Sequence, residues 1–319
     1  MATALPEGVE VARTEHFVFR DNVLLNLHHF LYQWATIEAL RDGTAERRRS
    51  VAVEEIDGPS ELDATELAAW RSAIDWYRRD AIEKDLLFNG DMYRLKGQLS
   101  DIEDADGEWP GEVDGDYARA LRAVLPVYRR HFWPQHHRVN VAWAKAAVVE
   151  LERYGATIAD RLTKAYGGTW PNEPIRVDLV YYANWAGAYT TGDPDHIVQS
   201  TTSDDTGNWA KLETLFHEAS HTRSVFGAMQ SEIDAPFPEQ APRDLWHVLL
   251  FMTAGHTVKR TAAEAGDEDY VEYGERNGLY GRGIWAELYT KASPHWASYL
   301  QGDLTRTEAL SRIAAAFGE

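Results

Sequence analysis

The feature that most constrains the fold is a change of hydrophobic pattern near residue 170. Before this point, apolar residues recur every three or four positions over long stretches, which is typical of amphipathic helices. Gly167, Gly168 and Pro171 then end the helical pattern. Apolar and polar residues alternate over 175–181, which predicts a β-strand, and a second short strand is predicted over 196–202, after a GDPD turn.

Helices are predicted on both sides of these strands. Before the change of pattern, helical spacing covers residues 18–40, 64–87, 117–132 and 134–166. After the strands, it covers residues 208–225 and 243–259, and further helices are expected up to Phe317. The acidic, glycine-containing segment 99–115 is expected to form a surface loop or a boundary between lobes.

These patterns together predict a mainly α-helical fold with a small β-sheet, of the α+β class. We expect a helical lobe over residues 1–170 and a second part over residues 171–319 that carries the chemistry. The two parts form either separate lobes or one continuous domain. A chain of 319 residues can bury a substantial core in both arrangements.

Composition narrows the chemistry and the partners. The chain has no cysteine, so disulfides, thiolate ligands and cysteine nucleophiles are excluded, and a metal would have to be bound by His, Asp or Glu. With 32 Lys and Arg against 51 Asp and Glu, the formal net charge is −19, which opposes binding to nucleic acid. No run of 18 apolar residues is present, so no membrane span is expected.

The beginning of the chain says little about the compartment. Its first residues do not resemble a signal peptide, because no charged region followed by an apolar stretch is present. A chain that starts after a removed signal would look the same. The sequence therefore leaves a cytoplasmic and an exported protein open, and it leaves the oligomeric state open as well.

The residues that carry chemistry lie in the motif HEASH, inside the predicted helix 208–225. His217 and His221 are four positions apart, so on a helix their side chains project from the same face, one turn from each other. Two imidazoles in this geometry can bind one tetrahedral zinc ion. Glu218 follows the first histidine, where its carboxylate can act as the general base toward a water at the metal. The motif predicts a Zn²⁺ site.

On these residues, the stretch from Ile175 to Lys259 resembles the catalytic core of zincin metallopeptidases, in which two strands precede the HExxH helix. The resemblance implies a zinc-dependent hydrolase whose substrate is a peptide. The metzincin pattern would require glycine at position 224 and histidine at position 227, where this chain has Ser224 and Gly227. The resemblance is therefore to the gluzincin-like group, whose third ligand comes from a later helix.

The motif supplies two metal ligands, and several residues are candidates for the third. We expect His247 first, because it lies 26 positions after His221, near the start of a predicted helix. His256 comes next. It lies nine positions further along, and nine steps of 100° turn its side chain to the opposite side of a straight helix. Glu232 and Glu239 come last, because their proline-containing segment would have to supply a ligand from a loop.

Two further elements are expected to support catalysis. Tyr273, Tyr280 and His295 follow the ligand helix and could stabilise the oxyanion of a tetrahedral intermediate. Tyr280 is preferred, because the glycines that flank it would allow close approach to a substrate. The strand predicted over 196–202 is either a sheet edge that binds an extended peptide or an ordinary strand.

Two other functions are compatible with the same motif. One is a metal-dependent enzyme that acts on a small molecule other than a peptide. The other is a protein with a structural zinc site, which is disfavoured because Glu218 is present and because a structural site would have a fourth protein ligand.

Overall fold

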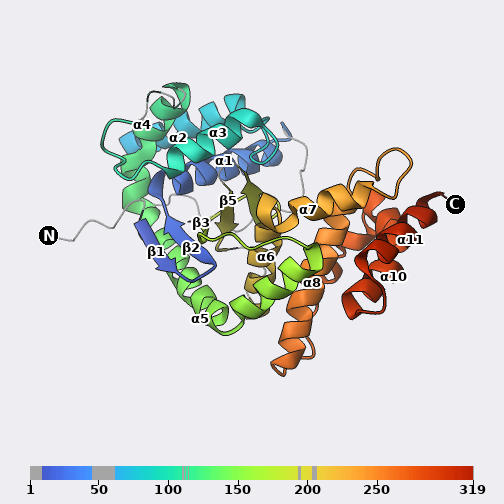
Figure 1. Ribbon diagram of the computed structural model, residues 1–319. Coiled ribbons are helices and arrows are strands. Elements are labelled where there is room, and N and C mark those ends of the chain that lie inside the picture. Colours follow the sequence, from blue (N-terminus) through green and yellow to red (C-terminus); the bar gives the residue numbers. More distant parts are fainter. Residues whose placement is uncertain are drawn as a thin grey trace. The chain divides into compact units, whose positions relative to one another are not determined.

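The computed structural model describes residues 9–44, 62–109, 111, 113, 115–192, 195–202 and 207–318. The chain divides into two compact units that interleave in sequence. The first unit comprises Met1–Arg13, Phe17–Ala146 and Arg176–Asp204, and the second comprises Thr14–His16, Ala147–Ile175 and Asp205–Glu319. Figure 1 shows helices throughout and, among the described residues, one five-stranded sheet. The predicted fold class, mainly α with a small β-sheet, is therefore confirmed.

The sheet is mixed and combines strands from both ends of the first unit. Its strands are β1 (Val9–Arg13), β2 (Phe17–Asp21), β3 (Ile175–Val180), β4 (Ala188–Thr191) and β5 (His196–Ser200). They lie in the order β1-β2-β3-β5-β4, with β3 and β5 parallel and with β4 and β5 antiparallel. The two strands predicted after residue 175 are present as β3 and β5. The three others were not predicted, because β4 has four residues and β2 leads directly into a helical pattern.

The position of β5 corrects one expectation. This strand lies between β3 and β4, so both sides of its backbone are paired within the sheet. All five of its residues are buried. The interpretation of residues 196–202 as a sheet edge open to an extended peptide is therefore wrong.

Among the residues that the structure describes, four helices and the beginning of a fifth belong to the first unit. They are α1 (Val23–Arg41), α2 (Ala64–Asp80), α3 (Gly90–Ser100), α4 (Gly115–His131) and α5 (Trp133–Tyr166), the last of which continues into the second unit. α1 is buried along most of its length and packs against α2, α3 and α4. The described residues between α3 and α4 form turns, as expected of a surface segment.

The start of α1 differs from the prediction, which extended this helix back to residue 18. Asn22 separates it from β2, because the Asn22 side-chain oxygen accepts hydrogen bonds from the backbone N–H groups of Leu24 and Leu25, both at 2.9 Å. Such a cap satisfies donors that the first turn of a helix leaves free. Residues 17–21 alternate between buried and half-buried, and this period of two was the signal for a strand.

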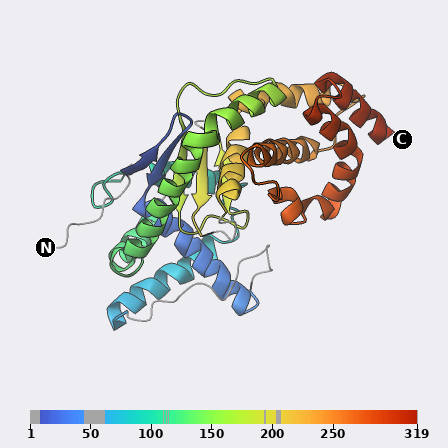
Figure 2. The same ribbon diagram turned by 90° about the horizontal axis from the view of Figure 1, so that it is seen from below.

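The second unit is helical. Besides the end of α5 it contains α6 (Asn208–Ser220), α7 (Arg223–Asp234), α8 (Leu245–Glu264), α9 (Tyr273–Arg276), the 3-10 turn η1 (Leu279–Gly281), α10 (Gly283–Gln301) and α11 (Arg306–Gly318). α8 is largely buried and packs against α6 and α10. Figure 2 shows α8 to α11, in orange to red, gathered in one group. In the part of the chain that the structure describes, no helix has the length and hydropathy of a membrane span.

The helix predicted over 208–225 is interrupted. α6 ends at Ser220, and the extended backbone of Thr222 (φ −69°, ψ 143°) starts the new helix α7. The start of α7 lies against Gly168, where a Cβ atom would be 2.0 Å from the Val225 carbonyl oxygen. The backbone N–H of Thr169 donates to the Ser224 carbonyl oxygen at 2.9 Å. The change of direction after α6 therefore brings the α5–β3 connection into contact with α7.

Candidate metal centre

Three histidines of the second unit come together at the C-terminal end of α6. His217 lies in the last turn of α6, His221 caps this helix, and His247 lies in the first turn of α8. One ring nitrogen of each lies within 4.8 Å of the others, so the three can hold one metal ion. The structure thus brings together the motif histidines and the residue that the sequence placed first as third ligand.

Local backbone geometry explains why the two motif histidines share a face. Although α6 ends at Ser220, His221 keeps a right-handed helical conformation (φ −73°, ψ −12°), so the four-residue spacing still places it one turn beyond His217. The position of the third histidine, His247, depends on the packing of two helices instead. α8 packs against α6, and its first turn holds His247 with a ring centroid 5.5 Å from that of His217 and 5.0 Å from that of His221.

The distance between the motif histidines fits a zinc ion. Their Nε2 atoms are 3.3 Å apart. Two nitrogens bound tetrahedrally to zinc at about 2.05 Å would be separated by about 3.3 Å. In addition, Nε2 of His247 is buried without a hydrogen-bond partner. A cation bound by the three imidazoles would satisfy the lone pair of this nitrogen, so the donor set and its spacing fit zinc.

Burial keeps the three imidazoles neutral, which is the state that binds a metal. Burial lowers the pKa of His217 well below its ordinary value, and the neighbouring His221 and His247 lower it further. Burial also lowers the pKa of His221 to about 4. The pKa of His247 falls to about 3, mainly through burial and then through His221. The site therefore presents uncharged nitrogen donors throughout the neutral pH range.

Glu218 follows His217 on α6 and is buried at the same end of the helix. Its backbone carbonyl accepts a hydrogen bond from the His221 N–H at 3.1 Å, so the residue belongs to the last turn of the helix. The structure therefore places Glu218 next to His217 in the last turn of α6, and the role of its carboxylate as general base stays a prediction.

Aromatic side chains surround the three histidines, and sequence reasoning missed their role. The Phe251 ring centroid lies 3.8 Å from that of His217. Trp246 stacks on His247 at 4.7 Å with an angle of 14° between the rings, and Trp285 meets the same histidine edge-on at 5.2 Å. These rings restrict the orientation of the imidazoles. Phe251 lies four positions after His247 on α8, a spacing that could have indicated its place on the same face.

The alternative third ligands lie elsewhere. His256 lies further along α8, and its pKa is lowered by burial and then by Arg260, Lys259 and Arg161, so its neighbours are cations. Glu232 lies within α7 and forms a two-hydrogen-bond ion pair with Arg306, at 2.6 and 2.8 Å. Glu239 is exposed.

The neighbours of Tyr280 are a tyrosine and a glycine rather than the three histidines. This residue is in η1, stacks on Tyr289 at 4.1 Å and crosses closely over Gly274. Its hydroxyl group is buried and has no hydrogen-bond partner. Tyr273, another candidate, stacks on Phe251 at 6.0 Å and is thus one ring removed from His217. A role of Tyr280 in stabilising an oxyanion stays a prediction.

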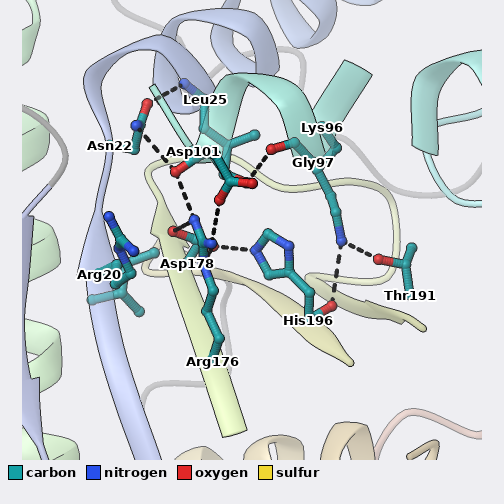
Figure 3. A network of polar contacts seen from close by, with 12 residues as sticks. Arg20, Asn22, Leu25, Lys96, Gly97, Asp101, Arg176, Asp178, Thr191 and His196 are labelled. Atoms are coloured by element: carbon teal, nitrogen blue, oxygen red, sulfur yellow. Dashed lines mark hydrogen bonds and ion pairs between the residues drawn. The ribbon is translucent and has the colours of Figure 1, made fainter. Parts of the chain in front are cut away.

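The first unit contains a separate buried polar network, shown in Figure 3. Lys96 of α3 donates to the Thr191 hydroxyl and to the His196 carbonyl oxygen, and Asp178 pairs with both His196 and Arg176. Although burial raises the pKa of Asp178, its two partners outweigh burial and hold this pKa below its ordinary value. The network links β3, β4 and β5 to α3, which indicates that it stabilises the sheet.

Comparisons of the chain with protein-family models, with curated proteins and with solved structures found no match. The case for a function therefore depends on the residues themselves. The main observation is the group of three neutral imidazoles, with Glu218 next to His217 on α6.

Proposed function

We propose that the protein is a zinc-dependent hydrolase, a metallopeptidase of the zincin type, in which His217, His221 and His247 hold Zn²⁺. The observation that carries the proposal is the convergence of three imidazole nitrogens from one buried and two partly buried histidines, with the Nε2 atoms of His217 and His221 3.3 Å apart. Nε2 of His247 is buried and has no hydrogen-bond partner, whereas a histidine buried by chance would be expected to satisfy its ring nitrogens.

The number of ligands favours catalysis over a structural role. Within the described ranges, the group that could hold a metal contains three protein ligands and no fourth His, Asp or Glu. Structural zinc sites are closed by four protein ligands, whereas catalytic sites keep one position open. The presence of Glu218 in the motif, directly after His217, also supports a hydrolase.

The roles of the residues follow from their chemistry. Zinc bound by three protein ligands would lower the pKa of a water at its open position to about 7. Glu218 would accept the proton of the attacking water on a carboxylate oxygen and pass it to the departing amine. His217, His221 and His247 stay neutral and hold their orientation through the aromatic rings around them.

The experiment replaces Glu218 by glutamine, which keeps the shape of the side chain but cannot take up the proton. Zinc content should equal that of the wild type, while cleavage of a mixed peptide library should fall by about 10²–10⁴-fold or more. Full cleavage by Glu218→Gln would contradict the mechanism. Wild-type protein that binds zinc and cleaves no peptide of the library would favour the small-molecule hydrolase instead.

A further inference from the structure

Glu213 continues the row of motif histidines by one helical turn. It precedes His217 by four residues, just as His217 precedes His221, so the three side chains lie along one face of α6. Glu213 is 2% exposed. A glutamate is rarely buried so completely unless it has partners, so the contacts of this carboxylate indicate what it does.

A matching row of residues lies on α8, at the same spacing of four. Its members are His247, Phe251 and Gly255. The ring centroid of His247 lies 5.0 Å from that of His221. One turn further along α8, the ring centroid of Phe251 lies 3.8 Å from that of His217. The two rows therefore face each other and run in opposite chain directions.

The third pair of facing residues is Glu213 and Gly255. A Cβ atom on Gly255 would be 3.1 Å from Glu213 Oε1 and 2.9 Å from the Cβ atom of Glu272. A side chain at this position of α8 would push both residues away. The glycine thus allows the Glu213 carboxylate, and the segment that follows α8, to lie directly on the α8 backbone.

The carboxylate of Glu213 connects α6 to the segment that follows α8. It accepts a hydrogen bond from the Tyr270 hydroxyl at 2.5 Å. The backbone N–H of Tyr273 donates to both of its oxygens, at 2.9 and 3.0 Å. Because Glu213 is buried and both tyrosines are half-buried, little water competes for these bonds. Residues 270–273 are thereby fastened to the helix that carries the motif.

The fastened segment carries a ring that reaches the metal centre. The ring of Tyr273 stacks on that of Phe251 at 6.0 Å, with an angle of 22° between them. Phe251 in turn packs on His217, and its centroid lies 5.0 Å from that of His247. Tyr273 therefore supports the ring that restricts two of the histidines, and Glu213 holds the backbone of Tyr273.

We propose that Glu213 is a positioning residue of the metal centre. It fastens the segment 270–273 to α6 and thereby holds Tyr273 and Phe251 against His217. The proposal rests on the proposed function, because it takes the three histidines as ligands of zinc. Glu213 acts through hydrogen bonds and ring contacts and is not itself a ligand.

The test measures zinc affinity, by competition with a chelator, for the wild type, Glu213→Ala and Glu213→Gln. Alanine removes the acceptor oxygens, so zinc should bind about three- to tenfold more weakly. Glutamine can accept from the Tyr273 N–H through its amide oxygen and donate to the Tyr270 oxygen through its amide nitrogen. Its zinc affinity should therefore stay near that of the wild type. Unchanged affinity in Glu213→Ala, or an equal loss in both variants, would overturn the proposal.

Glu232→Ala is the matched control. It also removes a glutamate of the second unit that accepts two hydrogen bonds, but these come from Arg306 and lie away from the segment 270–273. Its zinc affinity should equal that of the wild type. A loss as large as that of Glu213→Ala would mean a general effect on folding and would contradict a positioning role.

Hydrogen exchange of the Tyr273 amide in zinc-free protein separates this proposal from the proposed function. The amide should exchange about tenfold faster in Glu213→Ala than in the wild type, because it loses its acceptor, while Glu213→Gln should keep the protection. Equal protection in Glu213→Ala would overturn the proposal even if zinc binds. Wild-type protein without zinc affinity would instead overturn the proposed function, and with it the role of Glu213 toward the metal.

Discussion

At the scale of single residues, the decisive property of the candidate metal centre is that burial keeps His217, His221 and His247 neutral. The pKa of His221 is about 4 and that of His247 about 3, both below the ordinary value of 6.5. Protons therefore compete with a metal only in strongly acidic solution, in contrast to exposed histidines, which protonate near pH 6.5.

This property predicts the pH dependence of zinc binding. The zinc affinity of the folded chain, measured by competition with a chelator of known pH dependence, should stay nearly constant from pH 7 to pH 5. It should fall once the pH approaches 4, where His221 begins to take up a proton. An affinity that already drops tenfold per ligand for each pH unit below 6.5 would show that the imidazoles are solvated, contrary to the structure.

At the scale of elements, α8 positions its histidine through the aromatic residue that precedes it. Trp246 stacks on His247 and also meets His221 edge-on at 5.7 Å. Trp246→Ala should weaken zinc binding roughly tenfold, because His247 would lose the ring that holds its orientation. Trp209→Ala removes a tryptophan of the same unit that packs on Tyr154 instead, and its zinc affinity should match the wild type. Equal losses in both variants would mean a general effect on folding.

The contact between the α5–β3 connection and α7 makes a prediction about stability. A Cβ atom at Gly168 would collide with the Val225 carbonyl oxygen, and backbone cannot yield as a flexible side chain can. Gly168→Ala should lower the free energy of unfolding by about 1–3 kcal/mol, as urea titration would measure. Gly97→Ala in α3, where no atom lies within 4 Å, should instead be neutral or stabilising by roughly 0.5–1 kcal/mol. A neutral Gly168→Ala would show that α7 can move away.

At the scale of the whole molecule, local pattern predicted the elements better than their connections. The helices α1, α2, α4 and α5 and the strands β3 and β5 follow from periodicity, because each pattern is complete within its own segment. The helix α3 was not predicted. The strand β2 was hidden by the helical pattern that begins two residues later. The end of α6 at Ser220 was hidden as well, since helical spacing continues past it into α7.

The candidate site shows the same division. The spacing of His217 and His221 was sufficient to predict a shared face, because four residues make one helical turn. Helix geometry excluded His247 and His256 as joint ligands, since the two lie on opposite sides of a straight helix. The preference for His247 came from its position near the start of the predicted helix. The proximity of Glu213 and Glu272 to Gly255 could not be predicted, because the three residues are far apart in sequence or on different elements and come together only through packing.

The central claim is that three histidines of the second unit hold one zinc ion, and zinc content by elemental analysis tests it most directly. Wild-type protein dialysed against trace zinc should retain about one zinc ion per chain, as three protein ligands on one metal require. His247→Ala should lose most of this zinc, while His256→Ala, the same change further along α8, should retain it. Equal zinc in wild type and His247→Ala, or loss of zinc in His256→Ala alone, would contradict the account.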